Sequence, residues 1–205
     1  EARERSGLKY KMNNISTSRI QAFFNRFPLL EKVVTILNAA HIPFAIGGSG
    51  CLFLLGNKRL PDDVDIYLPD ERHDEADSLF KITSFVYRSA QEEVRNSNPE
   101  RNHSIQLTSK LILNVVGKKY NLSLDSMVLS RCLQTTYKQQ KVFLYPPEDV
   151  LLIKALLQRG PEVGKQDLAD IQAFLNVYPH LRMDYLKKRI TLLGAEKRVE
   201  KVFLG

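Results

Sequence analysis

The sequence predicts an α/β (α+β) domain that is followed by a helical C-terminal part. In the first half, helical and strand-like apolar periods alternate, as residues 16 to 40, 43 to 46 and 64 to 68 illustrate. Beyond Pro146 and Pro147 only helical patterns follow. At 205 residues, the chain is long enough to bury one sizeable core.

The first predicted helix covers residues 16 to 40. Ser16, Thr17 or Ser18 can cap its start, and its apolar positions recur at spacings of three and four. Pro28 cannot donate a backbone hydrogen bond and clashes with the preceding turn, so it should kink the helix or split it in two.

The remaining elements follow from periodicity, caps and turn residues. We expect strands at 43 to 46, 64 to 68, 85 to 88, 104 to 108, 110 to 116 and 119 to 125, and a strand pair within 135 to 144. We expect helices at 49 to 55, from Asp70 to about Phe80, and at 147 to 159, 165 to 177, 181 to 193 and 195 to 203. Gly117 and Lys118 predict a hairpin, and residues 91 to 102 a loop.

This pattern divides the chain into three parts. Residues 1 to 12 are polar and charged and are expected to form a flexible N-terminal segment. Residues 13 to 146 form the predicted α/β domain, and residues 147 to 205 form the helical part packed on it.

Composition limits the function classes. The net charge of +7 and a sequence pI near 9.4 favour polyanionic partners such as nucleic acid or nucleotides, although solubility alone also explains them. No apolar run has the roughly 20 residues that a membrane helix needs, so no membrane partner is expected. Two cysteines in apolar segments indicate a reducing compartment, which predicts a cytoplasmic protein.

A pair of aspartates on a predicted strand is the main chemical signal. Side chains alternate along a strand, so Asp63 and Asp65 share one face, opposite Val64 and Ile66, and Asp62 is expected in solvent. Two adjacent carboxylates repel each other unless a cation neutralises them. Mg²⁺ is such a cation, and it brings substrate phosphates with it.

The glycine turn before this strand fits a phosphate ligand. Gly47 and Gly48 place no side chain between the backbone and a ligand, and Ser49 can add a hydroxyl. The alternative is a tight turn followed by an edge strand with solvated aspartates.

These residues resemble the signature of the DNA polymerase beta-like nucleotidyltransferase superfamily. The signature is a hydrophobic strand ending in Gly-Gly or Gly-Ser, then a spacer, then Asp-x-Asp, which here covers residues 45 to 49 and Asp63 to Ile66. The resemblance implies the nucleotidyltransferase fold, a small mixed sheet flanked by helices. It also implies that Asp63 and Asp65 hold Mg²⁺ on a nucleoside triphosphate (NTP) bound by Gly47, Gly48 and Ser49.

In this superfamily a third carboxylate from a later strand usually completes the metal site and can act as base. Asp125 ends a strand-like segment and is the candidate for both roles. The alternative is that Asp125 caps a short helix, because it precedes Ser126, Met127 and Val128.

A second stretch, residues 147 to 175, resembles the C-terminal motif of the AbiEii-type branch, which includes toxins of toxin–antitoxin systems. Lys154 lies in a helix that is apolar almost all round and therefore needs an anion, either a triphosphate or Asp167. The resemblance implies that both residues act in nucleotide binding. The alternative is a structural Lys–Asp pair that joins two helices.

The match to this branch has departures. Pro61 stands where the branch often has Thr or Ser, and Gln166 separates Lys165 from Asp167. The aminoglycoside nucleotidyltransferases, which share an Asp-Asp-hydrophobic-Asp arrangement, are a neighbouring possibility.

The combined prediction is a Mg²⁺-dependent nucleotidyltransferase. It would move a nucleoside monophosphate from an NTP to an acceptor hydroxyl, with an RNA or tRNA end favoured and a small molecule or protein possible. The toxin-like branch adds a possible antitoxin partner. The alternative is a non-catalytic nucleotide- or RNA-binding module on the same fold.

Overall fold

The computed structural model describes residues 15–82, 88–89, 104–108, 111–114 and 124–203, with side chains described for 15–80 and 124–203. The expected N-terminal segment, the loop at 91 to 102 and the Gly117-Lys118 hairpin lie outside these residues.

Pro28 splits the first predicted helix in two. Helix α1 spans Thr17–Arg26, and the Ser16 side chain accepts a hydrogen bond from the Arg19 backbone N–H at its start. Helix α2 spans Leu30–Ala39. Both helices bury their apolar faces, and the Phe24 ring stacks on Tyr137 with the two ring centres 3.9 Å apart.

The sheet has seven strands in the order β3-β4-β5-β2-β1-β7-β6 and is mixed. The central strands β1 (Ala45–Ile46) and β2 (Val64–Tyr67) are antiparallel, whereas β1 pairs in parallel with β7 (Gln140–Leu144) and β2 with β5 (Leu111–Asn114). The remaining pairings are antiparallel and involve β3 (Arg88–Ser89), β4 (Ser104–Thr108) and β6 (Leu133–Tyr137).

The predicted strand pair within 135 to 144 is confirmed as the β6–β7 hairpin. Lys138 and Gln139 both have positive φ, 43° and 66°, and a two-residue turn of this kind matches the twist of the paired strands. After β2, Asp70–Arg72 forms a 3₁₀ turn before helix α4 (His73–Ile82), so the helix expected from Asp70 begins three residues later.

The segment expected as a strand at 119 to 125 differs at its described end. Residues 124 and 125 are not in a strand, and a short helix, α6 (Ser126–Leu129), follows directly.

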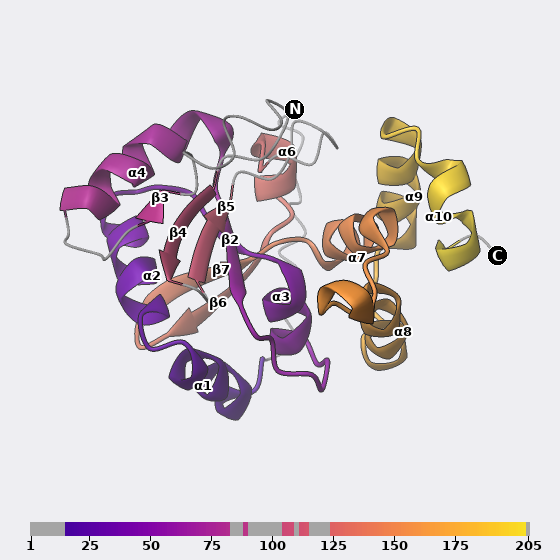
Figure 1. The fold of residues 1–205 in the computed structure, drawn as a ribbon, viewed down its shortest axis with the longest axis horizontal. Coiled ribbons are helices and arrows are strands. Elements are labelled where there is room, and N and C mark those ends of the chain that lie inside the picture. The colour runs from indigo at the N-terminus through magenta and orange to yellow at the C-terminus, as the bar shows by residue number, and fades with distance from the viewer. Residues whose placement is uncertain (1–14, 83–87, 90–103, 109–110, 115–123, 204–205) are drawn as a thin grey trace, which may run out of the picture.

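The four C-terminal helices are present as predicted. They are α7 (Pro147–Leu157), α8 (Asp167–Val177), α9 (Met183–Leu192) and α10 (Glu196–Phe203), with a 3₁₀ turn, Pro161–Val163, before α8. They gather on one side of the molecule, at the right of Figure 1 and away from α2 and α4. Helix α7 contacts the short helix α3 (Gly48–Leu54), which follows the glycine turn. None of the described helices has the length and apolar character needed to cross a membrane.

Candidate active site at the glycine turn and the aspartate strand

The aspartate pair lies at the start of the central strand β2. Val64 and Ile66 are fully buried on one face, whereas Asp65 is partly exposed on the other, as the alternation predicted. Asp63 precedes the strand with a side chain that is 32% exposed, and Asp62 is exposed. The two carboxylates of Asp63 and Asp65 are therefore open to a ligand from one side.

The glycine turn contacts Asp65, the second member of this pair. The Gly47 backbone N–H donates to the Asp65 carbonyl at 2.9 Å, which holds the turn against β2. Gly48 has a φ of +52°, and a Cβ at this position would lie 2.6 Å from Asp65 Oδ2. Only glycine can therefore bring the backbone this close to the carboxylate.

Asp65 is held in an unusual electrostatic environment. Burial, together with the charge of Asp63, raises the pKa of Asp65 to about 6, while the charges of Lys165 and Arg159 act in the opposite direction. An ionised Asp65 thus gains from any further cation that approaches the pair.

Lys154 is at the centre of a buried ion network between α7 and α8. Its Nζ lies 2.9 Å from Asp167 Oδ1 and 2.8 Å from Asp170 Oδ2, and its side chain is only 5% exposed. This is the geometry of the structural alternative, in which a Lys–Asp contact joins two helices. With its ammonium held by two carboxylates, Lys154 has little capacity left for a triphosphate.

Two arginines complete the network. Arg59 binds Asp170 through Nε at 2.9 Å and Nη2 at 2.6 Å, and Arg59 Nη2 also lies 3.4 Å from Ser49 Oγ. Arg159 Nε lies 2.8 Å from Asp167 Oδ2. Although burial acts to raise it, the pKa of Asp167 is lowered by the hydrogen bonds from Arg159 and Lys154.

Ser49 faces this network as well as the turn. Its hydroxyl lies 3.4 Å from Asp170 Oδ2, so the network reaches the residue predicted to contact phosphate. Ion pairs and hydrogen bonds therefore connect the loop before β2, the start of α3 and the α7–α8 junction.

Sequence reasoning did not assign a site role to Lys165, which the structure brings to the aspartate pair. Lys165 Nζ lies 3.2 Å from Asp63 Oδ2, and the two residues are 102 positions apart in the chain. The only signal in the sequence was the basic position before Asp167, and no local pattern connects it to Asp63.

Asp125 does not join the aspartate pair. Its carboxylate accepts a hydrogen bond from the Val128 N–H at 2.8 Å and caps helix α6, which is the alternative that the sequence left open. Among the described residues, no three acidic, histidine or cysteine side chains form a group able to hold a metal. The geometry therefore favours the helix-cap alternative for Asp125.

The strand beside β2 supplies no substitute. The parallel register pairs Asp65 with Ile112, and β5 reads Leu-Ile-Leu-Asn. The arrangement thus has two carboxylates within the part of the chain that the structure describes.

Solved structures with the same architecture are known. The crystal structure of ANT(2″)-Ia in complex with adenylyl-2″-tobramycin matches with a TM-score of 0.54 at 12% identity, over 84% of this chain and 99% of that one. The chain has the nucleotidyltransferase fold. The nucleotidyltransferase fold that the sequence predicted is thereby confirmed.

Two further structures match this nucleotidyltransferase fold. The solution structure of the antibiotic-resistance factor ANT(2″)-Ia gives a TM-score of 0.51 at 14% identity, over 91% of this chain and 96% of that one. The crystal structure of an antigenic nucleotidyltransferase-like protein from Paracoccidioides brasiliensis has a TM-score of 0.49 at 19% identity, over 93% of this chain and 94% of that one. No protein-family model and no curated protein sequence matches the chain.

The residues present fit the divalent cation that a nucleotidyltransferase fold implies. Asp63 and Asp65 offer hard oxygen ligands, and the missing Cβ of Gly48 leaves room beside Asp65 Oδ2. The Lys165 ammonium lies against Asp63, so this position already accommodates positive charge.

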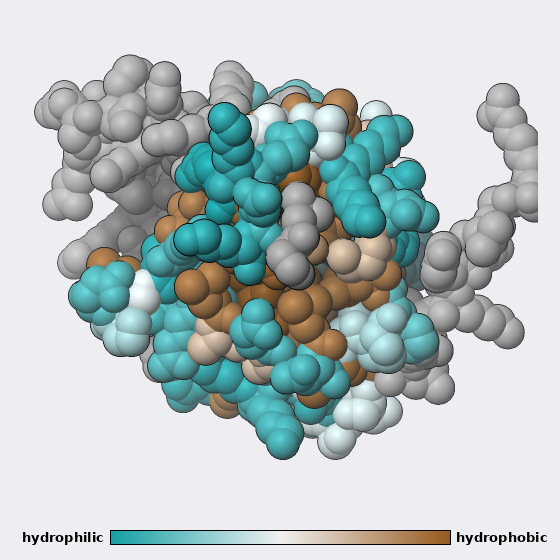
Figure 2. Space-filling view, turned by 90° about the vertical axis from the view of Figure 1, so that its right-hand side faces the viewer, coloured by the Kyte–Doolittle hydropathy of each residue, from teal (hydrophilic) through white to brown (hydrophobic). Residues whose placement is uncertain are grey.

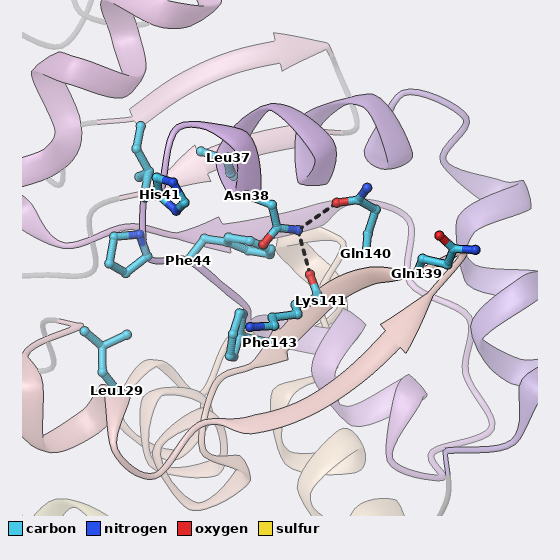
Figure 3. A pocket seen from close by; sticks show the side chains of 11 residues that line it. Leu37, Asn38, His41, Phe44, Leu129, Gln139, Gln140, Lys141 and Phe143 are labelled. Atoms are coloured by element: carbon cyan, nitrogen blue, oxygen red, sulfur yellow. Dashed lines mark hydrogen bonds between the residues drawn. The ribbon is translucent and has the colours of Figure 1, made fainter.

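Two cavities lie elsewhere on this nucleotidyltransferase fold. One, of about 510 Å³, opens between the end of α2 and β7, with His41, Phe44 and Phe143 among its lining residues (Figure 3). The other, of about 600 Å³, lies between α1 and β6 and includes Ile20 and Thr136. None of the predicted site residues lines either cavity.

Proposed function

We propose that the chain transfers a nucleoside monophosphate from an NTP to an acceptor hydroxyl and releases pyrophosphate. The observation that supports this most is the contact between Gly48 and Asp65 on a nucleotidyltransferase fold, with Asp63 beside them. A glycine turn packed on two carboxylates combines a place for phosphates with ligands for their cation.

The residues have distinct proposed roles. Asp63 and Asp65 hold Mg²⁺, which would neutralise phosphate charge and align the attack. Gly47, Gly48 and Ser49 lie along the phosphates. The acceptor oxygen forms a bond to the α-phosphorus as the bond to pyrophosphate breaks, and the acceptor proton passes to solvent.

Lys154 and Asp167 take a different role from the one that the resemblance implied. Because Lys154 is buried between Asp167 and Asp170, we propose that both residues position Arg59, Ser49 and Arg159 rather than contact the nucleotide. Their effect on nucleotide binding is then indirect.

The acceptor belongs to one of two classes. The positive net charge supports an RNA or tRNA end, which the sequence favoured. The ANT(2″)-Ia structure holds an adenylylated small molecule, adenylyl-2″-tobramycin, which supports a small polyhydroxylated acceptor. A protein hydroxyl or an antitoxin partner has no further support in the geometry.

The second candidate function is nucleotide binding without transfer. The observation that favours it is the lack of a third carboxylate at the aspartate pair among the described residues. NTP binding without incorporation of label would identify this function.

The first experiment incubates the protein with each α-³²P-labelled NTP, Mg²⁺ and, in separate reactions, total RNA, total protein or tobramycin. Asp63→Asn and Asp65→Asn should each lower label transfer by about 10³-fold, because a metal ligand contributes several kcal/mol to transition-state stabilisation. Asp62→Asn is the matched control, since Asp62 is exposed in the same loop and should leave transfer unchanged.

The outcomes separate the candidates. Label in one fraction names the acceptor class, provided that it disappears in Asp63→Asn. If Asp63→Asn keeps transfer within a few-fold of the unaltered protein, the proposed mechanism is wrong.

A further inference from the structure

Lys165 has a fixed backbone and a partly exposed ammonium group. Its N–H donates to the Gly160 carbonyl at 3.0 Å, and the next turn is closed by Asp167 N–H donating to the Arg159 carbonyl, also at 3.0 Å. The side chain is 35% exposed. Its position beside Asp63 is therefore set by the loop, while the ammonium can leave without unfolding any element.

The Lys165–Asp63 contact is the exchangeable ion pair of this region. Its N–O distance is 3.2 Å between two side chains that are each about one-third exposed, whereas Lys154 is almost fully buried and binds two carboxylates at 2.8 and 2.9 Å. Exposed pairs of this kind contribute little free energy, so a competing cation can replace the lysine. Arg159 is less free, because Asp167 binds it through its backbone and side chain.

The charge of Lys165 also acts on the second carboxylate of the pair. Its positive charge lowers the pKa of Asp65, against the effects of burial and of Asp63. One ammonium thus acts on both residues to which the metal is assigned in the proposed function.

We infer that Lys165 serves as an internal counter-cation of the aspartate pair that is displaced when the divalent cation binds and then pairs with the NTP phosphates. The inference rests on the proposed function. In the free protein the lysine reduces the repulsion between Asp63 and Asp65, and in the complex the same charge, carried by the same fixed loop, is available to the phosphates. Lys165 would therefore weaken metal binding alone and strengthen NTP binding.

Mn²⁺ and a non-hydrolysable NTP analogue test this inference on the full chain. Lys165→Ala should bind Mn²⁺ about two- to fivefold more tightly without nucleotide, as expected for the loss of one exposed competing ion pair. The same variant should bind the Mg²⁺-loaded analogue more weakly by a similar factor. Lys58→Ala, at an exposed lysine in the loop before Asp63, is the matched control and should change neither affinity.

Chemical labelling separates displacement from a general effect of charge. Limited acetylation of the unaltered protein, read by mass spectrometry, should modify Lys165 at least about twofold more when Mn²⁺ is present, because the ammonium has left Asp63. Adding the analogue together with Mn²⁺ should reverse the increase. Lys154, bound to two buried carboxylates, should stay protected throughout.

The results distinguish this inference from the proposed function. Equal Mn²⁺ affinity in the unaltered protein and Lys165→Ala, or Lys165 labelling that does not respond to Mn²⁺, overturns the inference while the metal site stands. No Mn²⁺ binding to either protein overturns the metal site of the proposed function and the inference with it.

Discussion

Gly48 is the residue at which the backbone comes closest to a carboxylate of the candidate site, so that a side chain would not fit. It has positive φ, and the nearest atom to an added Cβ would be Asp65 Oδ2 at 2.6 Å. Gly164 also has positive φ, +68°, but nothing lies within 4 Å of its Cβ position. The chain therefore contains a matched pair of glycines that share a backbone conformation disfavoured for other residues and differ in what an added Cβ would contact.

Alanine at these two positions separates strain from site geometry. Both Gly48→Ala and Gly164→Ala should lower the free energy of unfolding by about 1 kcal/mol, because a Cβ is disfavoured at positive φ. Only Gly48→Ala should also weaken Mn²⁺ binding, by about tenfold or about 1.4 kcal/mol, since Asp65 must move. Urea unfolding and Mn²⁺ titration measure the two effects.

Equal Mn²⁺ affinity in the two alanine variants would contradict this reading of the turn. It would mean that the Asp65 carboxylate can move aside without weakening Mn²⁺ binding.

Helix α7 links the C-terminal helices to one another and to the sheet. It carries three buried charged residues that bind different partners: Glu148 binds Arg182, Asp149 binds Arg189, and Lys154 binds α8. Tyr185 of α9 adds a further contact, because its hydroxyl donates a hydrogen bond to buried Asp149. The helix is therefore fixed by paired charges as well as by its leucines.

Removing the charge of Lys154 should destabilise the protein. Lys154→Met should lower the free energy of unfolding by about 3 kcal/mol, because Asp167 and Asp170 lose a shared partner in a buried site. Lys188→Met, on the exposed face of α9, should leave it unchanged. Urea denaturation of the three proteins provides the comparison.

NTP binding to the same variants tests the nucleotide-binding role of Lys154 that the resemblance implied. A large loss of NTP affinity in Lys154→Met with unchanged unfolding would identify the lysine as a direct nucleotide ligand.

At the scale of the whole molecule, the candidate site is shared between the two halves of the chain. Asp65 lies on β2 and Asp63 directly precedes it, whereas Lys165 and Arg159 come from the C-terminal part. Helix α3, which follows the glycine turn, contacts α7 of that part. Figure 2 looks onto the C-terminal side, where apolar side chains gather near the centre of the face and polar ones surround them. Leu192 of α9 is 55% exposed. The helical part is thus a component of the site.

This sharing predicts a single unfolding transition. Tyrosine fluorescence and far-UV circular dichroism should give the same urea midpoint, because Tyr67 and Tyr145 report on the sheet and Tyr178 and Tyr185 on the helical part. Two separated midpoints would instead show that residues 13 to 146 and 147 to 205 fold independently.

Much of the fold could be predicted from local patterns. Ser16, one of the three predicted candidate caps, caps α1, and Pro28 separates it from α2. The strand pair predicted within 135 to 144 forms a hairpin, and alternation on β2 buries Val64 and Ile66 opposite Asp65. Each of these features depends on residues close in sequence, whose spacing reflects the period of a helix or strand. Asp125 was ambiguous because a carboxylate before a short apolar run can end a strand or cap a helix.

The sequence by itself determined the type of fold and the aspartate pair beside the glycine turn. Only the tertiary structure decided which basic side chains bind these aspartates. Lys165, 102 positions away in the chain, forms an ion pair with Asp63, whereas Lys154 is bound by Asp167 and Asp170. The physical reason is that periodicity specifies which face of an element is buried. The partner of a charged side chain depends instead on how distant elements pack, and on which competing charges that packing brings within reach.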